Sequence, residues 1–199
     1  TKQVGNQFGT DRYALLFKNH GESAGAPLEH THSQLIALPV IPRQVHEELD
    51  GSRKYFEYRE RCIFCDIIRQ ERRDMKRVVF EDENVIVMAP YAARFPFEMW
   101  ILPRAHESHL EYAAAEMYKS LAAALGILLR KIDKALERPA YNFVLHNGGM
   151  KEAEQPHYHW HIEIIPRLTR LAGFEWGTGF YINPTPPEEA AQFLRNTQI

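Results

Sequence analysis

Two stretches of the chain carry polar side chains at every second position. Aligned on their closing prolines, the stretches match in three pairs: His30 with His157, His32 with His159, and Gln34 with His161. Residues two apart on a strand share one face of a sheet, so each trio projects together. A row of imidazoles can bind a metal ion, or present a nucleophile between polar groups that orient it. Because the polar positions recur at fixed offsets, we predict a duplicated module rather than a chance histidine-rich face.

The second candidate site is a pair of cysteines, Cys62 and Cys65, spaced Cys-x-x-Cys. A redox pair would follow a strand in a βαβ unit, and the pattern around these residues indicates no such unit. Two free structural cysteines would leave the spacing unexplained. A zinc knuckle would use both thiolates and needs two further ligands from elsewhere in the chain. We therefore expect a metal site.

Composition excludes several classes of function. The chain has 199 residues, a formal net charge of −2 and a pI near 6.5, whereas a nucleic-acid scaffold is usually distinctly basic. No apolar run approaches the roughly 20 residues of a membrane helix, and the polar start does not resemble a signal peptide. Two cysteines cannot form a disulfide framework. These properties favour a cytoplasmic protein that binds neither nucleic acid nor membranes.

The elements that would position these residues form an α+β pattern. The expected strands cover residues 12–19, 30–38, 77–81, 84–88, 97–102, 141–146 and 158–165. The expected helices cover 43–61, a short segment after Cys62, 111–137 and a final short helix that starts at Pro186. The strand order predicts a largely antiparallel sheet covered by one long helix.

The two copies differ in completeness. The second runs from Cys62 to Pro166, whereas much less chain precedes Pro39 in the first. We expect residues 1–61 to be the C-terminal remainder of a first module plus a connecting helix. Residues 62–199 would be a complete second module with a C-terminal extension. Either the first module is a remnant, or the chain is the C-terminal part of a longer polypeptide, and we favour the second because a relic would not be expected to keep an intact motif.

Several motifs resemble a known superfamily. The segments HYHWHIEIIPR, CIFCDI, VVFEDENVIV, WILPRAH and YNFVLHNGG resemble the histidine-triad (HIT) module. The tandem arrangement, with HTHSQ in the first copy, resembles the galactose-1-phosphate uridylyltransferase branch, which includes ADP-glucose phosphorylase-like members. The resemblance runs from about Tyr13 to the C-terminal helix. It implies a HIT-like antiparallel sheet in a tandem duplicated arrangement.

The resemblance also implies a mechanism. His32 would attack the α-phosphorus of a nucleotide sugar and carry the nucleotidyl group as a covalent intermediate. A sugar 1-phosphate or inorganic phosphate would then accept the group. Gln34 would donate hydrogen bonds to the phosphoryl oxygens, and Asn19 and Gly21 match the phosphate-contacting loop. Pro27 stands where the family usually has a hydroxyl residue.

Zinc is the implied cofactor. The resemblance completes the knuckle as Cys62, Cys65, His106 and His157, with His109 as a competitor for His106. By symmetry, His30 would bind a zinc ion of the first module. A second metal option follows other family members and uses Glu48, His146, His159 and His161.

The same resemblance implies a homodimer in which Glu175 accepts a sugar hydroxyl across the interface. Tyr181 stands where uridylyltransferases have an amide side chain, which puts galactose specificity in question. Two alternatives stay open at this point. One is a HIT-type nucleotide hydrolase with His159 as nucleophile, and the other is a non-catalytic, zinc-stabilised dimerisation fragment.

Overall fold

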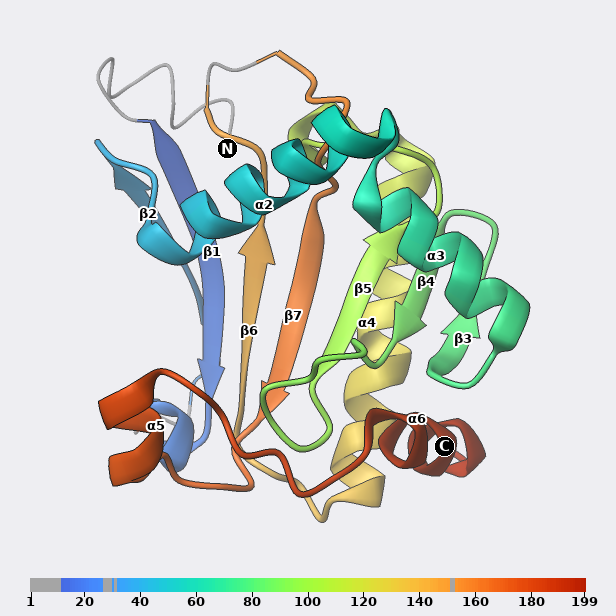
Figure 1. Cartoon of the computed structure of the whole chain (residues 1–199). Coiled ribbons are helices and arrows are strands. Elements are labelled where there is room, and N and C mark those ends of the chain that lie inside the picture. Colours follow the sequence, from blue (N-terminus) through green and yellow to red (C-terminus); the bar gives the residue numbers. More distant parts are fainter. Residues whose placement is uncertain (1–11, 27–29, 31, 151–152) are drawn as a thin grey trace.

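The computed structural model describes residues 12–26, 30, 32–150 and 153–199, and it contains one seven-stranded sheet (Figure 1). The strands are β1 Tyr13–His20, β2 Ser33–Leu38, β3 Val78–Glu81, β4 Val85–Met88, β5 Met99–Pro103, β6 Tyr141–His146 and β7 His161–Pro166. Their order is β2-β1-β6-β7-β5-β4-β3, and neighbouring strands pair antiparallel. The predicted α+β class and antiparallel sheet are confirmed.

Helices cover both faces of this sheet. They are α2 Arg43–Arg59, α3 Ile63–Asp74, α4 Ala115–Ala135, α5 Gly173–Thr178 and α6 Pro187–Asn196, with short 3₁₀ turns η1 Glu22–Ala24 and η2 Leu110–Tyr112. The apolar stripe of α4, including Leu121, Leu128 and Ile132, packs with α6 against one face. Helices α2 and α3 pack on the other face through Leu49, Phe64 and Ile68. The sequence predicted α4 as the cover and missed that α2 and α3 form a second layer.

Helix α3 brings both cysteines to one helix end. Cys62 is its N-cap, in an extended conformation, and Cys65 lies in its first turn. The helix continues to Asp74 and ends where Met75 adopts a left-handed conformation with φ of 52°. Both thiols therefore lie at the helix N-terminus, where the exposed N–H groups favour negative charge.

Strand β7 begins three residues later than predicted, at His161 rather than Tyr158. Pro156 and His157 form a turn, so regular alternation does not extend back to the first histidine of the trio. Consequently Tyr158 packs in the cluster on the α3 side, whereas Trp160 packs in the cluster on the α4 side. A strand starting at Tyr158 would put Tyr158 and Trp160 on one face, and that expectation is wrong.

The register of the sheet puts Gln34 on the face that α2 and α3 cover. Gln34 lies opposite Phe17, which lies opposite Val144, which lies opposite Glu163. Directly opposite residues on neighbouring strands point to the same side of a sheet. Three strand spacings separate Gln34 from Glu163, which is roughly 14 Å.

Within the described residues, none of the helices combines the length and the apolar character needed to cross a lipid bilayer.

Candidate active site and metal-binding clusters

His32 is exposed and precedes β2 by one residue. Its Nδ1 lies 3.1 Å from the main-chain oxygen of His30. A carbonyl oxygen only accepts hydrogen bonds, so Nδ1 carries the proton and donates it. The lone pair of the neutral ring is then on Nε2, which is the tautomer that a nucleophile needs. The flanking Gln34 is half-buried in β2.

Asn19 and Gly21, the predicted phosphate-contacting residues, lie where β1 ends. The Asn19 Oδ1 accepts a hydrogen bond of 2.7 Å from Nδ2 of Asn142, which also donates to the Ala24 main-chain oxygen at 2.9 Å. Gly21 has φ of +83°, and a Cβ there would lie 2.7 Å from the Cβ of Ala140. Both residues therefore shape the turn between β1 and η1.

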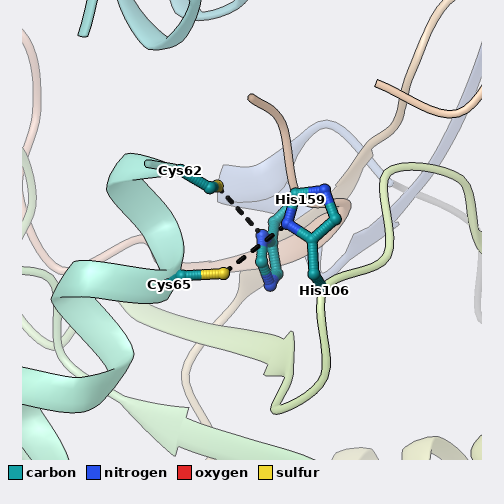
Figure 2. Close-up of side chains that lie close together, drawn as sticks. All are labelled: Cys62, Cys65, His106 and His159. Atoms are coloured by element: carbon teal, nitrogen blue, oxygen red, sulfur yellow. Dashed lines mark hydrogen bonds between the residues drawn. The ribbon is translucent and has the colours of Figure 1, made fainter. Parts of the chain in front are cut away.

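Four side chains from separate parts of the chain meet beside α3, and we call them the first cluster: Cys62, Cys65, His106 and His159 (Figure 2). Each offers one ligand atom, and these atoms lie within 4.8 Å of one another. The Sγ of Cys62 is 3.4 Å from Nδ1 of His159, and the Sγ of Cys65 is 3.5 Å from Nδ1 of His106. Two thiolates and two imidazoles are a donor set that suits tetrahedral zinc.

The fourth member differs from the prediction. The sequence motifs placed His157 in this set, and the structure places His159 there. His157 lies beside the cluster, with its main-chain oxygen 3.4 Å from the Sγ of Cys62 and its ring 6.5 Å from that of Phe56. The physical reason is the turn at Pro156 and His157, which directs the imidazole of His159, not that of His157, toward the cysteines.

The protonation states of the first cluster suit a metal. The hydrogen bond from Cys62, followed by that from His106, lowers the pKa of Cys65 to about 5. The pKa of Cys62 is raised, because its thiol donates to the Cys65 thiolate and is desolvated. Burial lowers the pKa of His159 to about 3, so its ring is neutral at physiological pH. The neutral imidazole of His159 and the thiolate of Cys65 are thus ready to bind zinc, and Cys62 would lose its proton when the metal binds.

The competitor His109 is not part of this cluster. It is buried, with Nδ1 2.8 Å from the Ser108 hydroxyl and Nε2 3.1 Å from the Gly149 main-chain oxygen. Gly148 packs so closely on the ring that a Cβ would lie 2.3 Å from Nε2. His109 therefore supports the loop after β6.

A second group of four possible ligands lies on the same sheet face, and we call it the second cluster: Glu48, His146, His161 and Glu163. The Nδ1 of His146 is 2.8 Å from the Glu48 carboxylate, and its Nε2 is 3.4 Å from that of Glu163. The ring of His161 stacks on that of His146 at 4.8 Å. The alternative metal site predicted from the sequence shares Glu48, His146 and His161 with this cluster but included His159, where the structure has Glu163.

Glu163 was missed although it continues the alternation two residues after His161. Its carboxylate also pairs with the guanidinium of Arg94, for which the sequence held no signal. Burial opposes the charge of Glu163, but His146 and Arg94 outweigh it and lower the pKa to about 2. Burial also opposes protonation of His146, but Glu163 and Glu48 raise its pKa to about 10. In this state a proton on His146 holds the two carboxylates together, in the place that a cation could take.

A buried nitrogen supports metal binding in the second cluster. The Nε2 atom of His161 is buried, and within the described residues it has no hydrogen-bond partner. An unpaired buried polar atom is costly, because it has lost its contact with water and gained nothing in return. Burial also lowers the pKa of His161 to about 4, so this ring too is neutral and can bind a cation.

Glu175 lies on α5, far along the chain from His32 and on a different element. Its carboxylate accepts a 3.0 Å hydrogen bond from the Ala172 main-chain nitrogen and so caps α5. Large apolar side chains around it are exposed: Phe174, Trp176, Phe180, Tyr181 and Ile182. The segment as a whole therefore presents a carboxylate within an exposed apolar surface.

Comparison with known proteins places these features in context. Residues 48–192 match a family described as the C-terminal domain of galactose-1-phosphate uridyl transferase. An ADP-glucose phosphorylase of Arabidopsis thaliana is 40% identical over 189 residues, which are 94% of this chain and 52% of that protein. A galactose-1-phosphate uridylyltransferase of Thermotoga maritima is 33% identical over 196 residues, which are 94% of this chain and 61% of that protein.

A solved structure gives the same result in three dimensions. The crystal structure of an ADP-glucose phosphorylase from Arabidopsis thaliana with bound ADP-glucose superposes with a TM-score of 0.91 at 38% identity. The match covers 100% of this chain and 64% of that one. The chain thus spans about half to two thirds of the length of these relatives.

Proposed function

The chain belongs to the galactose-1-phosphate uridylyltransferase family, and from this we propose that it is a nucleotidyltransferase. It would move a nucleoside monophosphate from a nucleotide sugar to a sugar 1-phosphate or to inorganic phosphate. The supporting relatives include an ADP-glucose phosphorylase and galactose-1-phosphate uridylyltransferases. We also propose that the chain consists of two parts. Residues 1–61 would be the remainder of a first module, which carries His32 and Gln34, and residues 62–199 would be the second module.

The observation that carries the proposal is the hydrogen bond between Nδ1 of His32 and the His30 main-chain oxygen. It fixes the tautomer, so that Nε2 can attack the α-phosphorus without an activating base. The new P–N bond forms as the bond from phosphorus to the sugar-phosphate oxygen breaks, and a sugar 1-phosphate leaves. An oxygen of the acceptor phosphate then attacks the same phosphorus, and the P–N bond breaks to regenerate His32.

Gln34 lies two residues further along, within β2, whereas His32 precedes that strand, which begins at Ser33 rather than at the predicted His30. Its amide can donate a hydrogen bond to a phosphoryl oxygen as charge develops there. It cannot deliver a proton or remove one from water, which favours transfer over hydrolysis. Asn19, Gly21 and Glu175 remain proposed contacts for phosphate and sugar, with Glu175 serving the other subunit of a homodimer.

Zinc in the first cluster is the proposed cofactor. The donor set fits, because two cysteines and two histidines converge with ligand atoms within 4.8 Å. The zinc would tie the start of α3 to the loop after β5 and to the entry of β7. The first cluster shares no residue with the proposed nucleophile, so zinc would stabilise the fold without taking part in the transfer. Free thiolates persist in a reducing compartment, which favours the cytoplasm.

The hydrolase alternative loses its support from geometry. His159 has no exposed surface, and its Nδ1 lies 3.4 Å from the Sγ of Cys62. A nucleophile must reach a phosphorus atom, and this ring is enclosed by protein.

The direct test is capture of the covalent intermediate. The chain is incubated with ADP-glucose or UDP-glucose labelled at the α-phosphorus, then denatured in base, and the protein-bound label is counted. We expect an acid-labile, base-stable adduct that His32→Gln abolishes. His20→Gln, which changes a histidine stacked on Tyr141 at the end of β1, is the matched control and should keep the adduct. If neither nucleotide sugar gave an adduct, the proposal would be contradicted, and the non-catalytic, zinc-stabilised fragment would be the remaining alternative.

A further inference from the structure

Phe64 occupies a position between the two clusters. It follows Cys62 by two residues in the first turn of α3 and is buried. Its ring centroid lies 5.9 Å from that of His159, in the first cluster, and 5.4 Å from that of His161, in the second. The side chain therefore starts from the cysteine knuckle and ends against a ligand of each cluster.

Packing more than hydrogen bonding determines the orientation of His161. Its Nδ1 has a 3.3 Å contact with the His159 main-chain oxygen, and its Nε2 has no hydrogen-bond partner within the described residues. Aromatic rings enclose it instead: Trp100 at 4.8 Å, His146 at 4.8 Å and Phe64 at 5.4 Å between centroids. Of these three rings, only that of Phe64 belongs to α3, the helix whose start carries the two cysteines.

The location of Phe64 is in turn determined by the start of α3. A metal bound to Cys62 and Cys65 would hold that first turn at a fixed distance from β7, because His159 is bound at the same time. Without a metal, the turn is held to β7 by contacts such as the 3.4 Å approach of Cys62 to His159. Metal binding in the first cluster should therefore fix the position of the Phe64 ring, which packs against His161 and orients it.

We infer that Phe64 is a positioning residue through which a metal in the first cluster tightens cation binding in the second. The inference rests on the proposed zinc site. Charge should contribute little, since the two thiolates neutralise a divalent ion in the first cluster. Coupling of this kind is reciprocal and typically changes affinity about 5- to 150-fold.

The experiment measures Mn²⁺ affinity in the second cluster with and without Zn²⁺ in the first. Carboxylates suit Mn²⁺ and thiolates suit Zn²⁺, so the two ions separate between the clusters. One equivalent of Zn²⁺ is added to the full chain, and protection of Cys62 and Cys65 from alkylation reports loading. Mn²⁺ is then titrated and its free fraction is followed by electron paramagnetic resonance.

We expect zinc to tighten Mn²⁺ binding by at least about fivefold in the wild type. In Phe64→Leu, zinc should still protect the thiols while the effect on Mn²⁺ falls below about twofold. Phe64→Met, which keeps apolar volume but loses the flat ring, should behave in the same way. Ile68→Val is the matched control, because Ile68 is buried one turn later on α3, and it should keep the full effect.

The outcomes separate the two ideas. Thiols that zinc never protects would refute the zinc site itself. Protected thiols with the same Mn²⁺ affinity in both states, or with no Mn²⁺ binding at all, would refute the coupling and leave the zinc site standing. If zinc still tightened Mn²⁺ binding to the full extent in both Phe64 variants, the coupling would not depend on Phe64, and its proposed role would be overturned.

Discussion

The Sγ of Cys62 lies 3.4 Å from Nδ1 of His159, so a residue at the start of α3 meets one that lies two residues before β7. This contact, together with that of Cys65 and His106, closes a Cys2His2 set around the end of a helix. It also decides which histidine of the second trio is the candidate ligand, and that choice can be tested.

His159→Ala should therefore lower the zinc content of the purified chain well below one equivalent, because it removes one of four ligands. His157→Ala should leave the content near one equivalent, since the four side chains that converge in the first cluster include His159 and not His157. Atomic absorption after dialysis measures both. Loss of zinc in His157→Ala with retention in His159→Ala would return the ligand role to His157.

Removal of the metal should destabilise the fold. A ligand present at 100 times its dissociation constant contributes about 2.7 kcal/mol, which for a chain of this size corresponds to a Tm change of roughly 5–11 °C. We expect a chelator to lower Tm by at least this amount and added Zn²⁺ to restore it. In Cys65→Ser, which weakens one ligand, the chelator should have little further effect. An unchanged Tm in the wild type would argue against a structural metal.

The metal-free chain should lose stability as the pH falls below about 6.5. Burial lowers the pKa of His159 to about 3 and that of His161 to about 4, whereas an unfolded histidine has a pKa near 6.5. The folded state therefore binds fewer protons, and this stabilisation is present above pH 6.5 and is lost as the pH falls toward 4. Each histidine contributes a slope of up to about 1.4 kcal/mol per pH unit, so the pair should cost about 3 kcal/mol between pH 6.5 and 5.

Urea unfolding of the chelated chain at several pH values measures this slope. His161→Gln isolates one of the two groups and should reduce the slope by about half. The contribution of His146 has the opposite sign, because its pKa is raised to about 10, and it is lost only as the pH rises above 6.5. A slope that His161→Gln leaves unchanged would show that acid destabilisation has another source.

Gly21 provides a prediction about the turn after β1. With φ of +83° and a Cβ that would meet Ala140 at 2.7 Å, Gly21→Ala should destabilise the chain by about 1–3 kcal/mol. Gly51 lies within α2, and no atom comes within 4 Å of the place where its Cβ would lie, so Gly51→Ala should instead stabilise by about 0.5–1 kcal/mol. Urea unfolding distinguishes the two. Equal stabilities would contradict a strained turn at Gly21.

Much of this fold could be predicted because its signals are local. The stripe of Leu121, Leu128 and Ile132 indicated α4, and alternating apolar residues indicated the strands. Three of the four residues in each cluster were also named in advance, but His106, Glu48 and His146 were named only through the family resemblance. The spacing Cys-x-x-Cys is local, and the histidine alternation marks one sheet face.

The errors came from features that the sequence pattern does not determine. The exchange of His157 for His159 depends on where a turn ends and a strand begins, and such boundaries are the least reliable part of a prediction. Arg94 reaches Glu163 from a loop before β5, a contact with no sequence periodicity. Helix α5 was missed because Gly173 and Gly177 interrupt its short sequence.

Among the three aligned pairs of polar residues, only Gln34 and His161 differ in residue type, and replacing Gln34 by histidine tests the mechanism most directly. Gln34→His would put a proton donor and acceptor beside the phosphoryl group on His32. General acid–base help to water contributes about 10²–10⁴-fold, so hydrolysis of the covalent intermediate should rise by at least about tenfold. The readout is the ratio of free nucleoside monophosphate to transferred product, with labelled nucleotide sugar and phosphate as acceptor. Gln34→Asn, which keeps the amide, is the control and should slow transfer without raising hydrolysis. An unchanged ratio in Gln34→His would contradict the idea that glutamine protects the covalent intermediate from water because it cannot transfer a proton.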